Sequence, residues 1–169
     1  MRESQHDHLV SVLAELGVKT CSVFVDIAGW RDSWNKVPRN LVDNPERVRE
    51  IDVLWFDDES IIAEFEVENT TGITEAIVRG SNILDKTCKR FIVIPEERHE
   101  KFLNKMDEPL LREKAGEYNW TMLYYDSVTE LFDKVKTRKT FDKAALFELA
   151  KTPKIKKLAA QESMEKYMG

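Results

Sequence analysis

The chain has 169 residues, of which 42% are hydrophobic and 34% are charged, with only five prolines and six glycines. These proportions are typical of a single folded domain and exclude a fibrous or a disordered chain. No run of about 18 apolar residues occurs, which excludes a membrane span. The first residues are polar and no apolar segment follows them, so we expect no signal peptide and a cytoplasmic location.

The net charge of −5 is unevenly distributed. Residues 136–157 carry eight lysines and arginines against two acidic residues, a local charge of +6 that leaves −11 for the rest of the chain. We therefore divide the chain into a core, residues 1–135, and a basic helical C-terminal extension, residues 136–169. This extension could follow nucleic-acid phosphates or only increase solubility, and the first interpretation is favoured. Its candidate nucleic-acid-binding residues are Lys136, Arg138, Lys139 and Lys154.

The first half of the chain begins with apolar residues at helical spacing. They predict a helix over residues 4–16, with Gly17 as its stop signal. Residues 21–28 alternate as a strand does, and residues 29–45 are polar and contain two prolines. We interpret this last segment as a long loop, a kind of segment that often has a function.

A hairpin and a helix are predicted next. Residues 51–56 and 61–67 have the composition of strands, and the polar turn between them predicts that they pair as an antiparallel hairpin. The apolar stripe from Ile73 to Leu84 predicts a helix, for which residues 70–72 can provide the cap.

The second half predicts two more strands and a helix between them. Residues 91–94 form a short, fully apolar strand, residues 98–114 a charged surface helix, and residues 120–125 a last strand. A basic helical tail begins at about residue 140. This order predicts an α/β fold with a mixed central β-sheet and helices on both of its faces.

Three carboxylates follow one another on one strand. Side chains alternate between the two faces of a strand, so Glu64, Glu66 and Glu68 share a face at intervals of about 7 Å. Like charges so arranged repel each other, and a divalent cation would offset that repulsion, with Asp52 on the neighbouring strand as a second ligand. The alternative, a strand whose polar face is simply solvated, stays equally open on this pattern alone.

The segments IDVLWF, FEVENTTGI and TEAIVRGSNIL resemble the PD-(D/E)XK nuclease superfamily, in particular small restriction-endonuclease-like domains. The resemblance implies a restriction-endonuclease-like fold in which Asp52 is the first metal ligand and Glu66 the acid of the second motif. Glu68 then occupies the position of the motif lysine. A glutamate offers no positive charge, and in restriction enzymes that resemble this family it acts there as a base or as a ligand for a second metal.

The activity implied by the resemblance is hydrolysis of phosphodiester bonds in a restriction, defence or repair setting, with DNA favoured as the substrate and RNA left open. Mg²⁺ or Mn²⁺ would lower the pKa of a bound water and neutralise charge on the phosphate, while Glu68 holds or deprotonates that water. We expect a homodimer, because cutting both strands requires two sites. The alternatives are a catalytically inactive nuclease fold that binds nucleic acid or a protein, and a plain interaction domain.

A few other side chains are candidates for the same site. Glu15 on the first helix is a further candidate metal ligand, because related nucleases sometimes carry an acid there. Arg79 either contacts a phosphate or pairs with a site carboxylate. We interpret at least one of Trp30 and Trp34 as a cover for the core. The histidines have no partner at metal-ligand spacing except in the His6-x-His8 pair near the terminus, so they receive no role.

Overall fold

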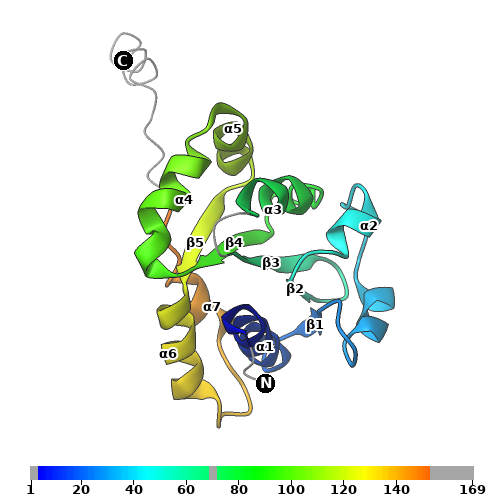
Figure 1. Ribbon diagram of the computed structural model, residues 1–169. Coiled ribbons are helices and arrows are strands. Elements are labelled where there is room, and N and C mark those ends of the chain that lie inside the picture. Colours follow the sequence, from blue (N-terminus) through cyan, green and yellow to red (C-terminus); the bar gives the residue numbers. More distant parts are fainter. Residues whose placement is uncertain (1–3, 69–71, 153–169) are drawn as a thin grey trace, which may run out of the picture.

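The computed structural model describes residues 4–68 and 72–152, which form a five-stranded sheet in the order β1-β2-β3-β4-β5 (Figure 1). The strands are β1 (Ser22–Phe24), β2 (Val53–Phe56), β3 (Ile61–Val67), β4 (Lys89–Ile94) and β5 (Trp120–Tyr124). The first three strands pair antiparallel, and β4 and β5 continue the sheet parallel to β3. The predicted hairpin and the mixed sheet are therefore confirmed.

Helices cover both faces of this sheet, as predicted. In Figure 1, α1, α6 and α7 lie on one side of the strands, and α3, α4 and α5 lie on the other. The helices are α1 (Gln5–Val18), η1 (Arg31–Lys36), α2 (Pro45–Val48), α3 (Ile73–Gly80), η2 (Glu96–Arg98), α4 (His99–Met106), α5 (Pro109–Glu117), α6 (Tyr125–Val135) and α7 (Lys143–Phe147). This architecture is consistent with the restriction-endonuclease-like fold. None of the described helices is long and apolar enough to cross a membrane.

One face of the sheet is an aromatic core under α1, α6 and α7. The rings of Phe65 and Phe91 stack at 5.0 Å, and Trp55 lies 4.7 Å from Phe65. The indole nitrogen of Trp55 donates a hydrogen bond to the carbonyl of Leu13 at 3.0 Å, which ties α1 to the sheet. Phe147 of α7 stacks on Phe91 at 5.4 Å, so the segment that follows residue 140 contributes to this core.

The opposite face lies under α3, α4 and α5 and combines apolar and charged side chains. Ile92, Ile94 and Met122 are fully buried there with the helices. Because side chains alternate along β3, Glu64 and Glu66 lie on this face rather than in the aromatic core. A helix therefore covers carboxylates that a half-exposed sheet would leave in water.

Several element boundaries differ from the predictions. The helix predicted over residues 98–114 is two helices, because Glu108 is extended and Pro109 starts a new helix. The first strand spans only Ser22–Phe24, and the predicted loop contains η1, whose Trp34 is buried against Phe24 as a core cover. Leu84 lies beyond the end of α3 and is 45% exposed, so it is not part of the helix stripe.

Helix α6 was not predicted, and the tail differs from a continuous helix. Val128 and Val135 of α6 are buried, and Leu131 and Phe132 pack against the same core at helical spacing. After α7 the chain turns, and Lys151 forms an isolated bridge with Met122 of β5. The predicted capping residues Thr70 and Thr71, together with residues 153–169, lie outside the described residues. The boundary at residues 135 and 136 stays a prediction.

Candidate metal centre

Asp52, Glu66 and Glu68 come together where β2 begins and β3 ends. The antiparallel register pairs Val53 with Phe65, so Asp52 comes opposite Glu66. One carboxylate oxygen from each of the three acids lies within 4.8 Å of the other two. Glu68 follows the last residue of β3, which brings its side chain to the same end of the strand. The three acids predicted to share a site are therefore neighbours in the structure.

Asp52 is held by contacts on both of its carboxylate oxygens. The backbone N–H of Val67 donates to Oδ2 at 2.7 Å, which fastens the side chain to the end of β3. Nε2 of His6, in the first turn of α1, lies 3.4 Å from Oδ1. The hydrogen bond to Asp52 raises the pKa of His6 to about 9 although partial burial opposes this shift. A protonated imidazole thus faces the carboxylate.

Glu66 is the innermost acid, with a side chain that is 0% exposed. Arg79 of α3 donates to both of its oxygens, from Nε to Oε1 at 2.9 Å and from Nη2 to Oε2 at 2.7 Å. Burial raises the pKa of Glu66 well above its usual range, and the hydrogen bonds from Arg79 oppose that shift. This fork of two parallel bonds is the strongest type of arginine–carboxylate contact.

Glu68 is half-buried, and its backbone is fixed from two sides. Its N–H donates to the carbonyl of Val93 at 2.9 Å, and its carbonyl accepts from the hydroxyl of Tyr125 at 3.0 Å. The side chain lies against the start of α3, where a Cβ added to Gly72 would be 2.5 Å from Oε2. Burial and the charge of Asp52 both raise the pKa of Glu68.

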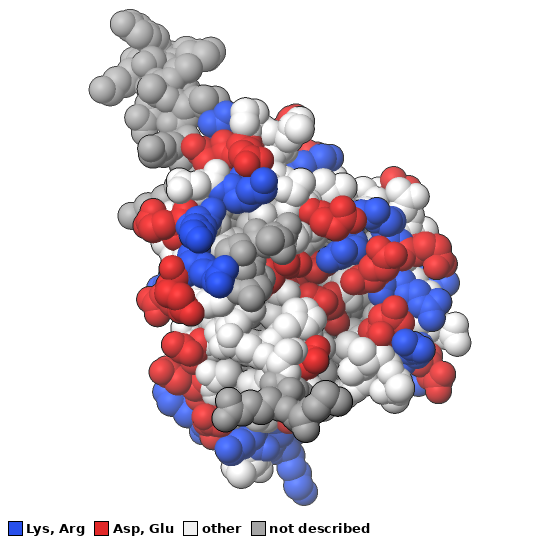
Figure 2. Space-filling model, viewed as in Figure 1, with Lys and Arg blue, Asp and Glu red and all other residues white. Residues whose placement is uncertain are grey.

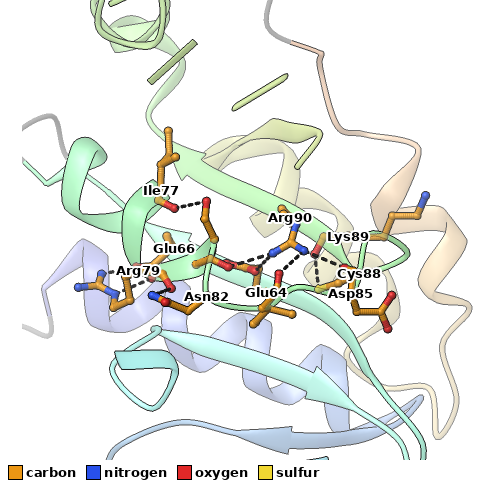
Figure 3. A network of polar contacts seen from close by, with 12 residues as sticks. Glu64, Glu66, Ile77, Arg79, Asn82, Asp85, Cys88, Lys89 and Arg90 are labelled. Carbon is orange, nitrogen blue, oxygen red and sulfur yellow. Dashed lines mark hydrogen bonds and ion pairs between the residues drawn. The ribbon is translucent and has the colours of Figure 1, made fainter. Parts of the chain in front are cut away.

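Glu64 lies further back on the same strand and pairs with a different arginine, Arg90 (Figure 3). Its Oε2 accepts from Nη1 of Arg90 at 2.5 Å, and both side chains are 0% exposed. Arg90 also donates to the carbonyls of Gly80, Ile83 and Asp85 at 2.9, 2.6 and 2.8 Å. Burial raises the pKa of Glu64 to about 8 against the opposing effect of Arg90. The alternative of a solvated strand face is therefore wrong for Glu64 and Glu66.

Of the other predicted site residues that the structure describes, Glu15 and the basic residues after α6 come from different parts of the fold than the three acids. Glu15 is exposed on α1, about 13 Å along the helix from His6, and is not part of the acidic group. Lys136, Arg138 and Lys139 follow the end of α6, whereas the start of α6 is the end that contacts Glu68. Lys154 lies outside the described residues.

Two residues of this region were not predicted. His6 was assigned no role, yet the start of α1 brings it to Asp52, and no periodicity in the sequence signals such a contact. Arg90 stands in an otherwise apolar strand, and a lone arginine between buried positions is a usable signal, because buried charges are normally paired. Parallel pairing then puts it directly beside Glu64.

A cavity of about 510 Å³ adjoins the candidate centre on the side of α1. Its lining includes Asp52 and His6 of the centre, three further acids, and apolar residues such as Val10 and Ile27. Figure 2 shows acidic side chains in the middle of the face toward the viewer, with lysines and arginines to the left and right of them. A phosphate approaching the acidic centre therefore meets repulsion unless a cation is present.

Comparison with known proteins gives one result. Residues 24–166 match the model of the family described as the type II restriction enzyme NmeDI C-terminal domain. Searches of curated proteins and of solved structures each gave no match. The matched segment is well over half of the chain and contains Asp52, Glu66, Glu68 and Arg79, whereas His6 and Glu15 precede it. The chain belongs to the family of type II restriction enzyme NmeDI C-terminal domains.

Proposed function

We propose that this chain is a metal-dependent nuclease of the PD-(D/E)XK type, which hydrolyses phosphodiester bonds of DNA in a restriction, defence or repair setting. The observation that carries the proposal is the group of three carboxylate oxygens within 4.8 Å of one another at the end of β3. Membership in a family named for a restriction-enzyme domain supports DNA as the substrate.

The donor set fits a small divalent cation. Mg²⁺ prefers carboxylate oxygens at about 2.0–2.1 Å, so two oxygens on one ion lie at most about 4.2 Å apart. The three oxygens here lie within 4.8 Å of one another, so small side-chain shifts would bring them to the separations that one ion requires. Mn²⁺ takes the same type of ligand. Asp52, Glu66 and Glu68 would hold the ion.

Asp52 and Glu68 have different parts in the proposed reaction. The bound ion supplies Lewis-acid stabilisation of the negative charge that grows on the phosphate. Asp52 is oriented by the N–H of Val67, so its carboxylate cannot swing away from the end of β3. Glu68 takes the place of the motif lysine and, because it is not fully buried, can hold the attacking water and accept its proton.

The cavity beside Asp52 provides the space for substrate next to these acids. Its volume of about 510 Å³ lies within the usual range for ligand sites. Because the lining is acidic, DNA binding there is expected to depend on the cation. The basic residues Lys136, Arg138, Lys139 and Lys154 remain proposed phosphate contacts further along the DNA.

Cleavage of supercoiled plasmid with Mg²⁺ or Mn²⁺ tests this function. The native chain is expected to cut, and Glu66→Gln is expected to lose cutting by at least about a hundredfold, because a buried ligand has lost its charge. Glu59→Gln is the matched control, since this exposed residue lies in the turn at the other end of β3. Equal cutting by native and Glu66→Gln protein would reject the site.

The form of the product tests the proposed dimer. A dimer with two sites converts plasmid to the linear form, whereas a monomer with one site makes open circles. Light scattering on the same preparation gives the mass. If the folded native chain cuts no DNA at all, the second candidate function, a catalytically inactive nuclease fold that binds nucleic acid, takes precedence. The glutamate at the lysine position favours that candidate.

A further inference from the structure

Arg79 binds the carboxylate of Glu66, which the proposed metal also requires as a ligand. Both oxygens of Glu66 receive a hydrogen bond from its guanidinium, at 2.9 and 2.7 Å. A divalent cation on Glu66 would lie within a few ångströms of this guanidinium, in a region where burial strengthens repulsion between like charges. The guanidinium and a cation are therefore alternative counter-ions for Glu66.

Arg79 is free to leave Glu66 in a way that Arg90 is not free to leave Glu64. Arg90 is fully enclosed and donates to three backbone carbonyls besides its carboxylate. Within residues 4–68 and 72–152, the side chain of Arg79 donates hydrogen bonds only to Glu66, and it is 14% exposed. Among the described residues, moving the Arg79 side chain therefore breaks its contact with Glu66 and takes no hydrogen-bond donor from a backbone carbonyl.

We infer that Arg79 exchanges partners when the site is loaded: it holds Glu66 in the metal-free protein, releases at least one of its oxygens to the divalent cation, and then binds a phosphate group of the nucleic acid. This inference rests on the proposed function. The sequence left two roles open for Arg79, a pair with a site carboxylate and a contact with a phosphate. In this inference Arg79 has the first role without metal and the second role when metal and nucleic acid are bound. A guanidinium suits both partners, since it forms the same forked contact with carboxylate and with phosphate.

Partner exchange by Arg79 would couple the binding of metal to the binding of DNA. If the cation frees Arg79 for phosphate, metal binding increases the affinity for DNA, and DNA increases the affinity for metal by the same factor. Couplings between two sites commonly lie between about 5-fold and 150-fold. Attraction between the metal and the phosphate also contributes to such coupling, so the part carried by Arg79 must be isolated by substitution.

The direct test follows the arginine Nε–H signals by nuclear magnetic resonance while Mg²⁺ is added to the full chain. The signal of Arg79 is identified by its loss in Arg79→Lys. We expect it to shift in a saturable way, with the midpoint that calorimetry gives for Mg²⁺ binding. The signal of Arg90 serves as the internal control and is expected to stay unchanged, because its partners are all structural.

A second measurement compares binding of a labelled DNA duplex with and without Ca²⁺. We expect Ca²⁺ to increase the affinity of the native chain at least fivefold, and Arg79→Gln to lose most of this increase while still binding the cation. Arg47→Gln removes an exposed arginine that pairs with Glu75, and it is expected to keep the increase.

The outcomes separate this inference from the proposed function. Saturable Mg²⁺ binding that disappears in Asp52→Asn, together with an unchanged Arg79 signal, would overturn the exchange and leave the metal site intact. Loss of metal binding in Arg79→Gln would also overturn it, because Arg79 would then be a fixed support of Glu66. Absence of saturable Mg²⁺ binding by the native chain would reject the metal site itself and the exchange with it.

Discussion

Two glutamate–arginine pairs on the same face of β3 are the most informative comparison in this molecule (Figure 3). Glu64 with Arg90 and Glu66 with Arg79 use the same residue types, two positions apart, and both glutamates are 0% exposed. Arg90 comes from the neighbouring strand β4 and lies wholly inside, whereas Arg79 comes from α3 and reaches the surface. One pair is part of the fold, and the other is part of the proposed metal site.

The difference lies in what else each arginine contacts. Arg90 collects the carbonyls of Gly80, Ile83 and Asp85, so it closes the end of α3 and the turn that follows. Gly80 is the last residue of α3, where a carbonyl lacks the i+4 partner that it would have inside the helix. Arg79 has no comparable set of backbone partners among the described residues. A buried ion pair is therefore structural or exchangeable according to the number of further groups that depend on it.

The largest expected effect comes from removing the enclosed arginine. Arg90→Met leaves Glu64 without its cation and removes one hydrogen-bond donor from each of three carbonyls, and should lower the free energy of unfolding by about 3–5 kcal/mol. Arg79→Met leaves only Glu66 unpaired and should cost about 1–3 kcal/mol. Urea unfolding of both variants measures the difference. Equal losses of unfolding free energy in the two variants would contradict the difference proposed between the Arg90 and Arg79 pairs.

The next largest loss of unfolding free energy is expected from a substitution at Gly80, because α3 passes very close to Glu64 at this residue. A Cβ on Gly80 would lie 2.5 Å from the Trp120 ring and would clash with Oε1 of Glu64. Gly80→Ala should therefore cost about 1–3 kcal/mol of unfolding free energy. Gly116→Ala in α5 is the matched control, since its Cβ would meet nothing within 4 Å, and it should stabilise by up to about 1 kcal/mol. A neutral Gly80→Ala would contradict the close packing.

Gly72, at the other end of α3, tests the site rather than the fold. Among the described residues, the three atoms nearest to a Cβ there all belong to the flexible end of Glu68, with Oε2 at 2.5 Å. Gly72→Ala should leave the melting temperature nearly unchanged while it displaces the carboxylate and weakens Mg²⁺ binding about tenfold. Calorimetry with Mg²⁺ measures this change. Unaltered Mg²⁺ affinity would remove Glu68 from the proposed ligands.

The smallest effect is expected from a third glutamate–arginine pair. Arg47 and Glu75 are 2.6 Å apart, as close as the buried pairs, but their side chains are 41% and 58% exposed. Arg47→Gln should change the free energy of unfolding by less than about 1 kcal/mol, because water screens the contact. A larger loss in urea unfolding would show that distance, rather than burial and further partners, decides the strength of these pairs.

The sequence predicted those parts of the fold that depend on local pattern. The apolar spacing of α1 and the alternation in β2 and β3 are local properties, and the helix and the hairpin are present in the structure. The break at Pro109 was missed because residues 98–114 have a continuous helical composition, although a proline favours the first turn of a helix. Helix α6 follows β5 directly, and its apolar spacing was overlooked.

For the site, the sequence predicted which acids approach one another but not their partners. Hairpin register alone brings Asp52 opposite Glu66, so this part needs no tertiary information. The contact of His6 depends on how α1 lies across the sheet, and the division between the Arg79 and Arg90 pairs depends on how α3 covers it. Packing angles of this kind are not encoded in the periodicity of a single segment.

Calorimetric titration with Mg²⁺ of Glu66→Gln and Glu64→Gln, beside the native chain, tests the central claim most directly. Both variants make the same chemical change on the same strand face, and circular dichroism can establish that both are folded. The account predicts that Glu66→Gln weakens Mg²⁺ binding by at least about tenfold, whereas Glu64→Gln binds Mg²⁺ like the native chain. Native-like binding by Glu66→Gln, or an equal loss in both variants, would contradict it.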